Sequence, residues 1–569
     1  MIQNIKNNYR NIDLISVLKI VIIIITTIYV FGNFEPYFEG SDSYLYGIVA
    51  KNLTDGIYAI SNELFSDTGR VEFIGENWRK TSENTLVPVA GIGLPVVGAI
   101  FYFIASDFGL YYLSPIFTII LLILSERIST NFFGRNTGLI VLLLMSSSNL
   151  ILRNGTNLQT EAIFSSFFIL GIFYLVKYFE KYDSSKIFLA SIFFVISSFI
   201  RINGAIIFPV EIFIVGGYFI WKKYSSKKQI KNFNKKEKRK NRFNSSKKLK
   251  IIVFLLIPWI VFFGYWFLSN DIFFGDPLTN YRLESQTFGP EITRDSNITS
   301  LLSLDTKNFE NMKSYSKYLL PYQVPAIYNK TIENYEQILG VDWIGFIALM
   351  ILGIIVIISL FQKHHRKKMI IFSLIILATV WFFSAVTTEE RALQGVPARY
   401  MIPVMPLGFM MFGFLILKSY DFLKNKKRVL ALLLKIGLAV FFITSFYYTI
   451  LFQDLSKNEF NFTDPKKYEK IYPLSMEGVY SNDVILAVHT DWAIDYGLNS
   501  FRLTENMPQE SIKLLKEIIN DDQHNVYVFK IPTYINEENR IEQLIVKHGF
   551  ILENYSDTFY KLKINDDNR

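Results

Sequence analysis

Long apolar segments recur along this 569-residue chain and constrain its fold more than any other feature. A helix needs about 20 mostly apolar residues to cross about 30 Å of hydrocarbon. Backbone in lipid must also satisfy its own hydrogen bonds. We therefore predict an α-helical polytopic membrane protein with candidate segments at residues 14–33, 87–105, 110–127, 136–152, 162–179, 186–201, 204–221, 251–270, 341–361, 369–388, 400–420 and 428–452.

Clusters of Lys and Arg between these segments set the expected orientation. They lie at residues 6–10, 222–250, 363–368 and 424–428, and the positive-inside rule places all four in the cytoplasm. Much of the net charge of +9 belongs to the 222–250 loop. The charge therefore indicates topology and contact with anionic lipid headgroups, and not nucleic-acid binding. The first segment lacks a small-residue cleavage site, so we interpret it as a retained span.

The four basic clusters agree with one another only if one early segment does not cross the membrane. If every segment between residues 14 and 221 spanned, the basic loop at 222–250 would lie outside. Segment 87–105 is rich in helix breakers, namely Pro88, Gly91, Gly93, Pro95 and Gly98. Such residues fit a juxtamembrane helix better than a lipid-facing span. We therefore predict about 11 spans in the plasma membrane, with the N-terminus cytoplasmic and the C-terminus extracytoplasmic.

Three polar regions fall outside the cell in this topology: the loops 34–86 and 271–340, and residues 453–569. The last region has the pattern of a small α/β domain. The expected elements are a strand at 484–488, a helix at 511–519, a strand at 526–531, a helix at 537–548 and one or two strands within 550–564. We therefore divide the chain into a transmembrane domain, 1–452, and an extracytoplasmic α/β domain, 453–569.

The cysteine and histidine content limits the covalent and metal chemistry that the chain can support. The chain has no Cys and five His. A disulfide, a thiolate nucleophile and a Cys-ligated metal are therefore excluded. The histidines include only one close pair, His364 and His365, so a His-rich zinc site is not expected. The sequence leaves other metal requirements open.

Four charged residues lie at the predicted outer ends of spans, although they are far apart in the sequence. Asp42 follows the first span, Glu161 and Arg399 each lie at the start of a span, and Arg201 closes one. Charged groups at membrane depth are costly, so they are usually paired, interfacial or functional. Each residue alone fits a snorkelling or helix-end position, but two acids and two arginines on one face favour a site. Glu211, inside its span, is either a further site residue or a buried acid bonded to a neighbouring helix.

These residue types indicate a class of chemistry. Guanidinium groups bind phosphate through forked hydrogen bonds, and a carboxylate serves as a general base or a metal ligand. An aqueous site that holds both fits transfer of a group from a lipid-linked phosphate to an acceptor hydroxyl. The arginines, with or without a divalent cation, would stabilise the leaving phosphate, while Asp42 would accept the proton of the acceptor.

Four short motifs, in this order and spacing, carry a family resemblance. They are Ser41-Asp-Ser-Tyr-Leu-Tyr46 after the first span, Thr160-Glu161 at a span start, Arg201-Ile-Asn-Gly204 at a span end, and the late run that places Arg399, Tyr400, Pro403 and Pro406. Over roughly residues 14–450 the sequence resembles the GT-C superfamily of integral-membrane glycosyltransferases. Within that superfamily it is similar to the family 39-like branch, which includes protein O-mannosyltransferases and the aminoarabinose transferase of lipid A.

The resemblance implies a GT-C transmembrane fold and a polyprenyl- or dolichyl-phosphate sugar as donor, with inversion at the anomeric carbon. It implies Asp42 as the catalytic base, Glu161 as the second catalytic acidic residue, and Arg201, Arg399 and Tyr400 as contacts of the donor phosphate. A divalent cation (Mg or Mn), the sugar, and a lipid, glycan or protein acceptor all remain open. Ser43, where mannosyltransferases have the Glu of an Asp-Glu pair, and the missing His-Pro-Pro-Leu-type motif count against a protein acceptor.

Three alternatives remain at the level of sequence, one of which is a purely structural membrane scaffold that would tolerate Asp42→Ala. The other two are enzymatic or transport functions. Trp492-Ala-Ile-Asp495-Tyr496-Gly497 is similar to the Trp-Trp-Asp-Tyr-Gly motif of oligosaccharyltransferases, although the tryptophan pair is absent. A transporter or flippase of lipid-linked sugars is the second alternative. It would show paired repeats with helices broken near the membrane midplane, and no such repeat stands out in the sequence.

Overall fold

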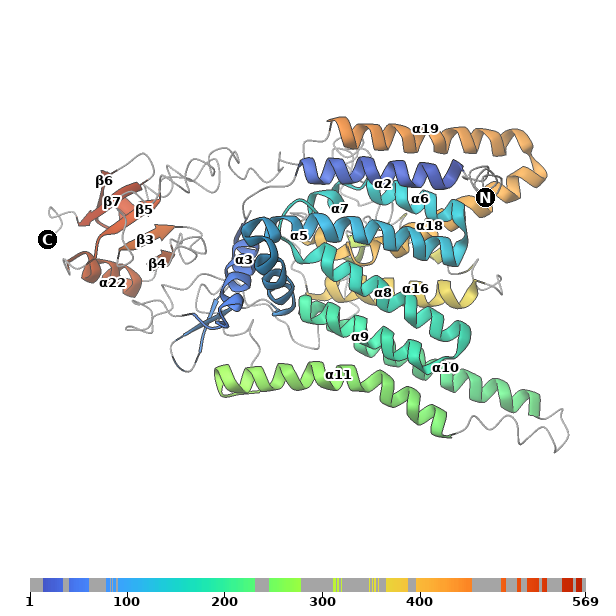
Figure 1. Cartoon of the computed structure of the whole chain (residues 1–569), viewed down its shortest axis with the longest axis horizontal. Coiled ribbons are helices and arrows are strands. Elements are labelled where there is room, and N and C mark those ends of the chain that lie inside the picture. Colours follow the sequence, from blue (N-terminus) through green and yellow to red (C-terminus); the bar gives the residue numbers. More distant parts are fainter. Residues whose placement is uncertain are drawn as a thin grey trace, which may run out of the picture. The chain divides into compact units, whose positions relative to one another are not determined.

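Figure 1 shows the computed structural model of the chain. The described residues are 14–33, 40–60, most of 78–88, 91–230, 245–277, scattered positions between 311 and 357, 365–386, 396–452, 483–487, 499–502, 509–520, 524–529, 545–555 and 559–564. The chain divides into two compact units. One contains Met1–Pro36, Tyr111–Gly264 and Arg294–Gln453, and the other contains Tyr37–Leu110, Tyr265–Thr293 and Asp454–Arg569.

Eight helices among the described residues are long and apolar enough to cross a membrane. They are Leu14–Gly32, Gly93–Phe133, Thr160–Lys181, Ile202–Ile220, Lys248–Phe274, Arg366–Ser384, Met405–Lys426 and Arg428–Tyr447. Arg135–Ser146 and Ser184–Ile200 are shorter apolar helices. The predicted multi-pass, α-helical membrane fold is confirmed. The count of about 11 spans stays a prediction, because segment 341–361 lies largely outside the described residues.

Helix α8 (Thr160–Lys181) lies at the centre of the first unit, between α9 (Ser184–Ile200) and α16 (Arg366–Val386) (Figure 1). Its packing against α9 is close because Gly171 has no side chain. A Cβ atom at Gly171 would lie 2.5 Å from the Phe194 ring. Protein interiors are packed at crystal-like density, so this glycine fixes the distance between the two helices.

Four further helices of this unit pack against one another. α18 (Met405–Lys426) packs against α6 (Arg135–Ser146) and α19 (Arg428–Phe452), while α2 (Leu14–Gly32) packs against α6 (Figure 1). The outer face of α19 exposes large apolar side chains, namely Val429, Leu432, Leu433, Ile436, Val440 and Ile443. Such a face is suited to contact with lipid.

Helix α5 (Gly93–Phe133) contains a sharp reversal. Ala105 and Ser106 have non-helical backbone angles, and Ser106 has a positive φ of 50°. Beyond the reversal Gly109 lies so close to the Phe101 carbonyl that a Cβ atom would overlap it. The part before Ala105 is therefore a separate helix of roughly 18 Å, too short to cross about 30 Å of hydrocarbon. This length agrees with the predicted non-crossing segment, whose place at the membrane surface stays a prediction.

The same region corrects two details of the sequence interpretation. Residues 86–88 form strand β2 (Leu86–Pro88), which pairs antiparallel with β1 (Trp78–Lys80), so the helix begins at Gly93 instead of residue 87. The predicted polar loop 34–86 contains helix α3 (Gly40–Thr54). This helix packs on the α5 reversal, where Ala50 Cβ would lie 3.0 Å from a Cβ at Gly98.

The end of the chain contains the predicted α/β structure. A five-stranded sheet has the order β4-β3-β5-β7-β6, and helix α22 (Gln509–Asn520) connects β4 to β5. β3 (Val484–Ala487) pairs in parallel with β4 (Asn499–Arg502) and with β5 (Val526–Phe529). β7 (Phe559–Ile564) is antiparallel to β5 and to β6 (Phe550–Asn554). Strand β4 was not predicted, and the expected helix 537–548 lies mostly outside the described residues.

Candidate functional site

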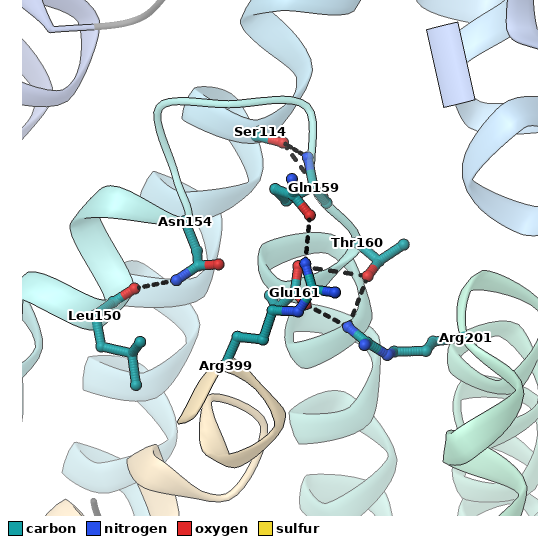
Figure 2. Close-up of polar contacts among 8 residues, drawn as sticks. All are labelled: Ser114, Leu150, Asn154, Gln159, Thr160, Glu161, Arg201 and Arg399. Carbon is teal, nitrogen blue, oxygen red and sulfur yellow. Dashed lines mark hydrogen bonds and ion pairs between the residues drawn. The ribbon is translucent and has the colours of Figure 1, made fainter. Parts of the chain in front are cut away.

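A short buried loop carries Glu161 to its place at the start of α8. The loop follows α7 (Asn149–Arg153), where the Asn154 side-chain amide donates to the Leu150 carbonyl at 2.7 Å (Figure 2). Gly155 lies against α5, since a Cβ atom there would overlap the Thr118 side chain. The loop thus has little freedom to move.

Gln159 ends this loop and is tied to α5 through its backbone. Its N–H donates to Ser114 Oγ at 3.0 Å, and its carbonyl lies 3.2 Å from the same oxygen (Figure 2). Glu161 then occupies the first turn of α8 and is 1% exposed. The partial positive charge of a helix N-terminus stabilises a carboxylate in that position.

Arg201 reaches Glu161 from the end of α9. It is the residue that ends α9 and begins the short helix η2 (Ile202–Ile206). Its Nη1 forms an ion pair with Glu161 Oε1 and donates to Thr160 Oγ1 at 3.0 Å. Gly204 allows this turn to approach α8, because a Cβ atom there would lie 2.7 Å from the Phe164 ring.

Arg399 approaches the same carboxylate from a third element. It lies in the short helix η8 (Val396–Met401), just before α18. Its Nε is 3.6 Å from Glu161 Oε1, and its Nη1 donates to Gln159 Oε1 at 3.3 Å (Figure 2). The Arg399 side chain is 26% exposed, compared with 17% for Arg201. Arg399 is therefore the more accessible of the two.

Tyr400 holds the cluster from one side. Its ring stacks on Phe383, with centroids 5.0 Å apart and an interplanar angle of 13°. The Arg201 guanidinium lies 4.5 Å from the Tyr400 ring centroid, within cation–π range. Sequence reasoning named Tyr400 as a phosphate contact. The structure places its ring against the Arg201 guanidinium, and its contact with a phosphate stays a prediction.

Two guanidinium groups meet at one carboxylate in this cluster. Arginine forks bind phosphate and carboxylate with matched geometry. Such a pair of arginines is therefore suited to contact with a phosphate group.

The described residues do not fit a divalent cation. Among them, no group of three or more His, Asp or Glu side chains is placed to hold a metal ion. The Glu161 carboxylate, the acidic group of this cluster, is already paired with two guanidinium groups.

Two predicted residues, Asp42 and Glu211, remain. Asp42 is in the first turn of α3, in the second compact unit, and its side chain lies outside the described residues, so its role stays a prediction. Glu211 does not join the arginine cluster; it is buried in α10 (Ile207–Ile230). Gln159 and Ser114 were missed, although a polar residue directly before Thr160-Glu161 was a usable signal.

No family model matches the sequence, and no curated protein sequence matches it. The fold is nevertheless similar to that of ArnT from Cupriavidus metallidurans bound to undecaprenyl phosphate. The TM-score is 0.52 at 7% identity, and the match covers 95% of this chain and 97% of that chain. Apo ArnT gives a TM-score of 0.50 at 8% identity, over 96% and 98% of the two chains. The chain has a GT-C fold.

Another GT-C protein has a comparable similarity. The Archaeoglobus fulgidus oligosaccharyltransferase in complex with Zn and sulfate gives a TM-score of 0.50 at 11% identity. That match covers 95% of this chain and 72% of the oligosaccharyltransferase chain. The predicted GT-C fold is therefore confirmed.

Proposed function

We propose that this GT-C chain is a membrane glycosyltransferase that moves a sugar from a polyprenyl-phosphate donor to an acceptor hydroxyl on the extracytoplasmic face. The observation that carries the proposal is the cluster in which Arg201 and Arg399 meet at Glu161. The similarity in fold to an ArnT structure that holds undecaprenyl phosphate supports it.

In the proposed reaction, the acceptor oxygen attacks the anomeric carbon and the bond to the lipid phosphate oxygen breaks. Asp42 accepts the proton of the hydroxyl, and the lipid phosphate leaves with the bonding electron pair. Attack opposite the leaving group inverts the anomeric carbon. Arg399, assisted by Arg201, stabilises the charge that develops on the phosphate, the kind of electrostatic contribution that lowers a barrier most.

Glu161 takes a different part from Asp42 in this scheme. A general base needs a lone pair directed at the substrate, whereas the Glu161 carboxylate is 1% exposed and paired with two arginines. We assign Glu161 to hold both guanidinium groups in the position that receives the phosphate. The proton transfer then belongs to Asp42 alone.

An oligosaccharyltransferase-like activity is the second candidate. The fold match covers 72% of the archaeal oligosaccharyltransferase chain and 97% of the ArnT chain, and the fold is similar to both. A flippase of lipid-linked sugars would use the same arginines for binding but would form no new glycosidic bond.

The deciding experiment is a transfer assay with purified protein in nanodiscs and a panel of undecaprenyl- and dolichyl-phosphate sugars. We expect free lipid phosphate and a glycosylated acceptor from one donor class, and neither product from Asp42→Asn. Wild-type turnover by Asp42→Asn would overturn the assignment of the base. Translocation in proteoliposomes without release of lipid phosphate would favour the flippase.

A further inference from the structure

Glu211 is a fully buried carboxyl group that the proposed reaction does not use. It lies in the candidate span Ile202–Ile220 and has 0% exposure. Its Oε1 is 2.9 Å from Ser191 Oγ of α9. Its Oε2 accepts a hydrogen bond of 2.9 Å from Trp259 Nε1 of α11 (Ser245–Phe274). One side chain therefore joins three helices.

No basic group compensates a charge at this position. Within the described part of the chain, no Lys, Arg or His is paired with Glu211, whose partners are Ser191 and Trp259. The basic side chains that flank these partners are engaged elsewhere: Lys186 of α9 lies over the Tyr174 ring and Lys250 of α11 over the Phe254 ring. A buried carboxylate without a cation pays a large desolvation cost.

The hydrogen-bond pattern also accommodates an acidic proton. The Ser191 hydroxyl has one proton but two oxygens in range, the Ile187 carbonyl at 3.1 Å and Glu211 Oε1 at 2.9 Å. If the hydroxyl donates to Ile187, a proton on Oε1 completes the second contact. Trp259 Nε1 can only donate, so Oε2 serves as the carbonyl oxygen. A neutral acid satisfies every group in this network.

We propose that Glu211 is held as a neutral carboxylic acid that fastens α9, α10 and α11 together and thereby positions Arg201. Arg201 ends α9, and only the five residues of η2 separate it from α10. A shift of α9 against α10 would therefore move its guanidinium away from Glu161. The part about Arg201 rests on the proposed function; the part about the neutral acid does not.

Aromatic contacts continue the interface between α9, α10 and α11 toward Arg201. Phe208 of α10 contacts Trp259 with ring centroids 4.9 Å apart. Phe199 of α9, two residues before Arg201, contacts Phe262 of α11 edge to face at 5.0 Å. The hydrogen bonds of Glu211 thus sit in a packed interface, where removal of one partner leaves a buried donor unsatisfied.

Infrared spectroscopy tests the neutral acid directly. The difference spectrum between wild type and Glu211→Gln at neutral pH is expected to show the carbonyl band of a protonated carboxylic acid in the wild type only. A spectrum with carboxylate bands and no acid band would overturn the proposal. Glutamine is the matched replacement, because its amide can donate to Ser191 and its oxygen can accept from Trp259.

Binding of undecaprenyl phosphate to the purified variants tests the positioning role. We expect Glu211→Gln to bind within about twofold of wild type and Glu211→Leu to bind about tenfold more weakly. Trp259→Phe tests the same interface between α9, α10 and α11 if Glu211→Leu does not fold. Ser373→Ala is the control, since Ser373 Oγ bonds only to the Met369 carbonyl of its own helix, at 2.8 Å.

The outcomes separate this proposal from the proposed function. Equal loss of binding in Glu211→Gln and Glu211→Leu, or wild-type binding by both Glu211→Leu and Trp259→Phe, would overturn the positioning role. If wild-type protein does not bind undecaprenyl phosphate at all, the proposed function fails, while the infrared band still decides the state of Glu211.

Discussion

Arg399 shares the Oε1 atom of Glu161 with Arg201 but keeps a longer distance, with its Nε at 3.6 Å. Arg201 also donates to Thr160, and Arg399 donates to Gln159. Both guanidinium groups lie near the Tyr400 ring, at 4.5 Å for Arg201 and 5.7 Å for Arg399. Arg399 is the more exposed of the two, at 26% compared with 17%.

We expect Arg399→Lys to weaken undecaprenyl phosphate binding about tenfold although the charge is retained. A lysine offers a point charge in place of the guanidinium fork. Binding to purified protein by isothermal titration is the measurement. Lys418→Arg on α18 is a suitable control because Lys418 lies over the Phe414 ring, outside the cluster. Unchanged affinity in Arg399→Lys would contradict the phosphate role.

We expect Asp42→Asn to abolish glycosyl transfer while leaving the fold intact, because asparagine cannot accept the acceptor's proton. Turnover and thermal unfolding should be measured on the same preparation. Asp107→Asn is the matched control: Asp107 forms a partly exposed ion pair with Lys51 at 3.2 Å, and such pairs contribute little. Equal loss of activity in both variants would refute a special role for Asp42.

Glu161→Gln should lower stability by about 3 kcal/mol or more, because it leaves two guanidinium groups without their buried counter-charge. A bound phosphate would replace that charge. Undecaprenyl phosphate is therefore expected to raise the melting temperature of Glu161→Gln more than that of the wild type. Thermal scans with and without the lipid check this, and an equal shift in both proteins would argue against a phosphate beside these arginines.

Gly109→Ala should destabilise the chain by about 1–3 kcal/mol, the usual cost of overpacking. The added methyl group would overlap the Phe101 carbonyl at the α5 reversal. Gly437→Ala in α19 is the control, because no atom of the described residues lies within 4 Å of its Cβ position. Thermal unfolding of the two variants should differ clearly. Equal melting temperatures for the two variants would contradict a close backbone contact at the reversal.

Topology is tested with reporters fused after Lys235 and after Tyr560. The basic loop should place the first in the cytoplasm, and an odd number of spans should place the second outside. The same location for both reporters would show that the count of crossing segments is wrong.

Sequence reasoning predicted which residues form the site better than it predicted the contacts between them. The ends of spans are readable because charges avoid hydrocarbon, and this rule singled out Glu161, Arg201 and Arg399. That all three meet at one oxygen depends on helix packing, for example on Gly204 against Phe164, which no local pattern encodes. Gln159 was missed because its role follows from the Ser114 contact on another helix.

The fold was predictable where the periodic signal is long. The spans, β3, β5 and α22 follow from apolar runs and amphipathic spacing. β4 was not predicted because Asn499-Ser-Phe-Arg502 is short and mostly polar, as suits a strand at the edge of a sheet. The start of α5 was misplaced because Val87 and Pro88 are apolar yet belong to a strand.

The burial of Glu161 has a consequence for ionic conditions. Mobile salt ions screen charges that water reaches, and buried pairs are screened much less. Glu161 is 1% exposed and Arg399 is 26% exposed. Added salt ions should therefore compete with an incoming anion for Arg399, but they should not separate the two arginines from Glu161. The site would then bind less anion and keep its shape.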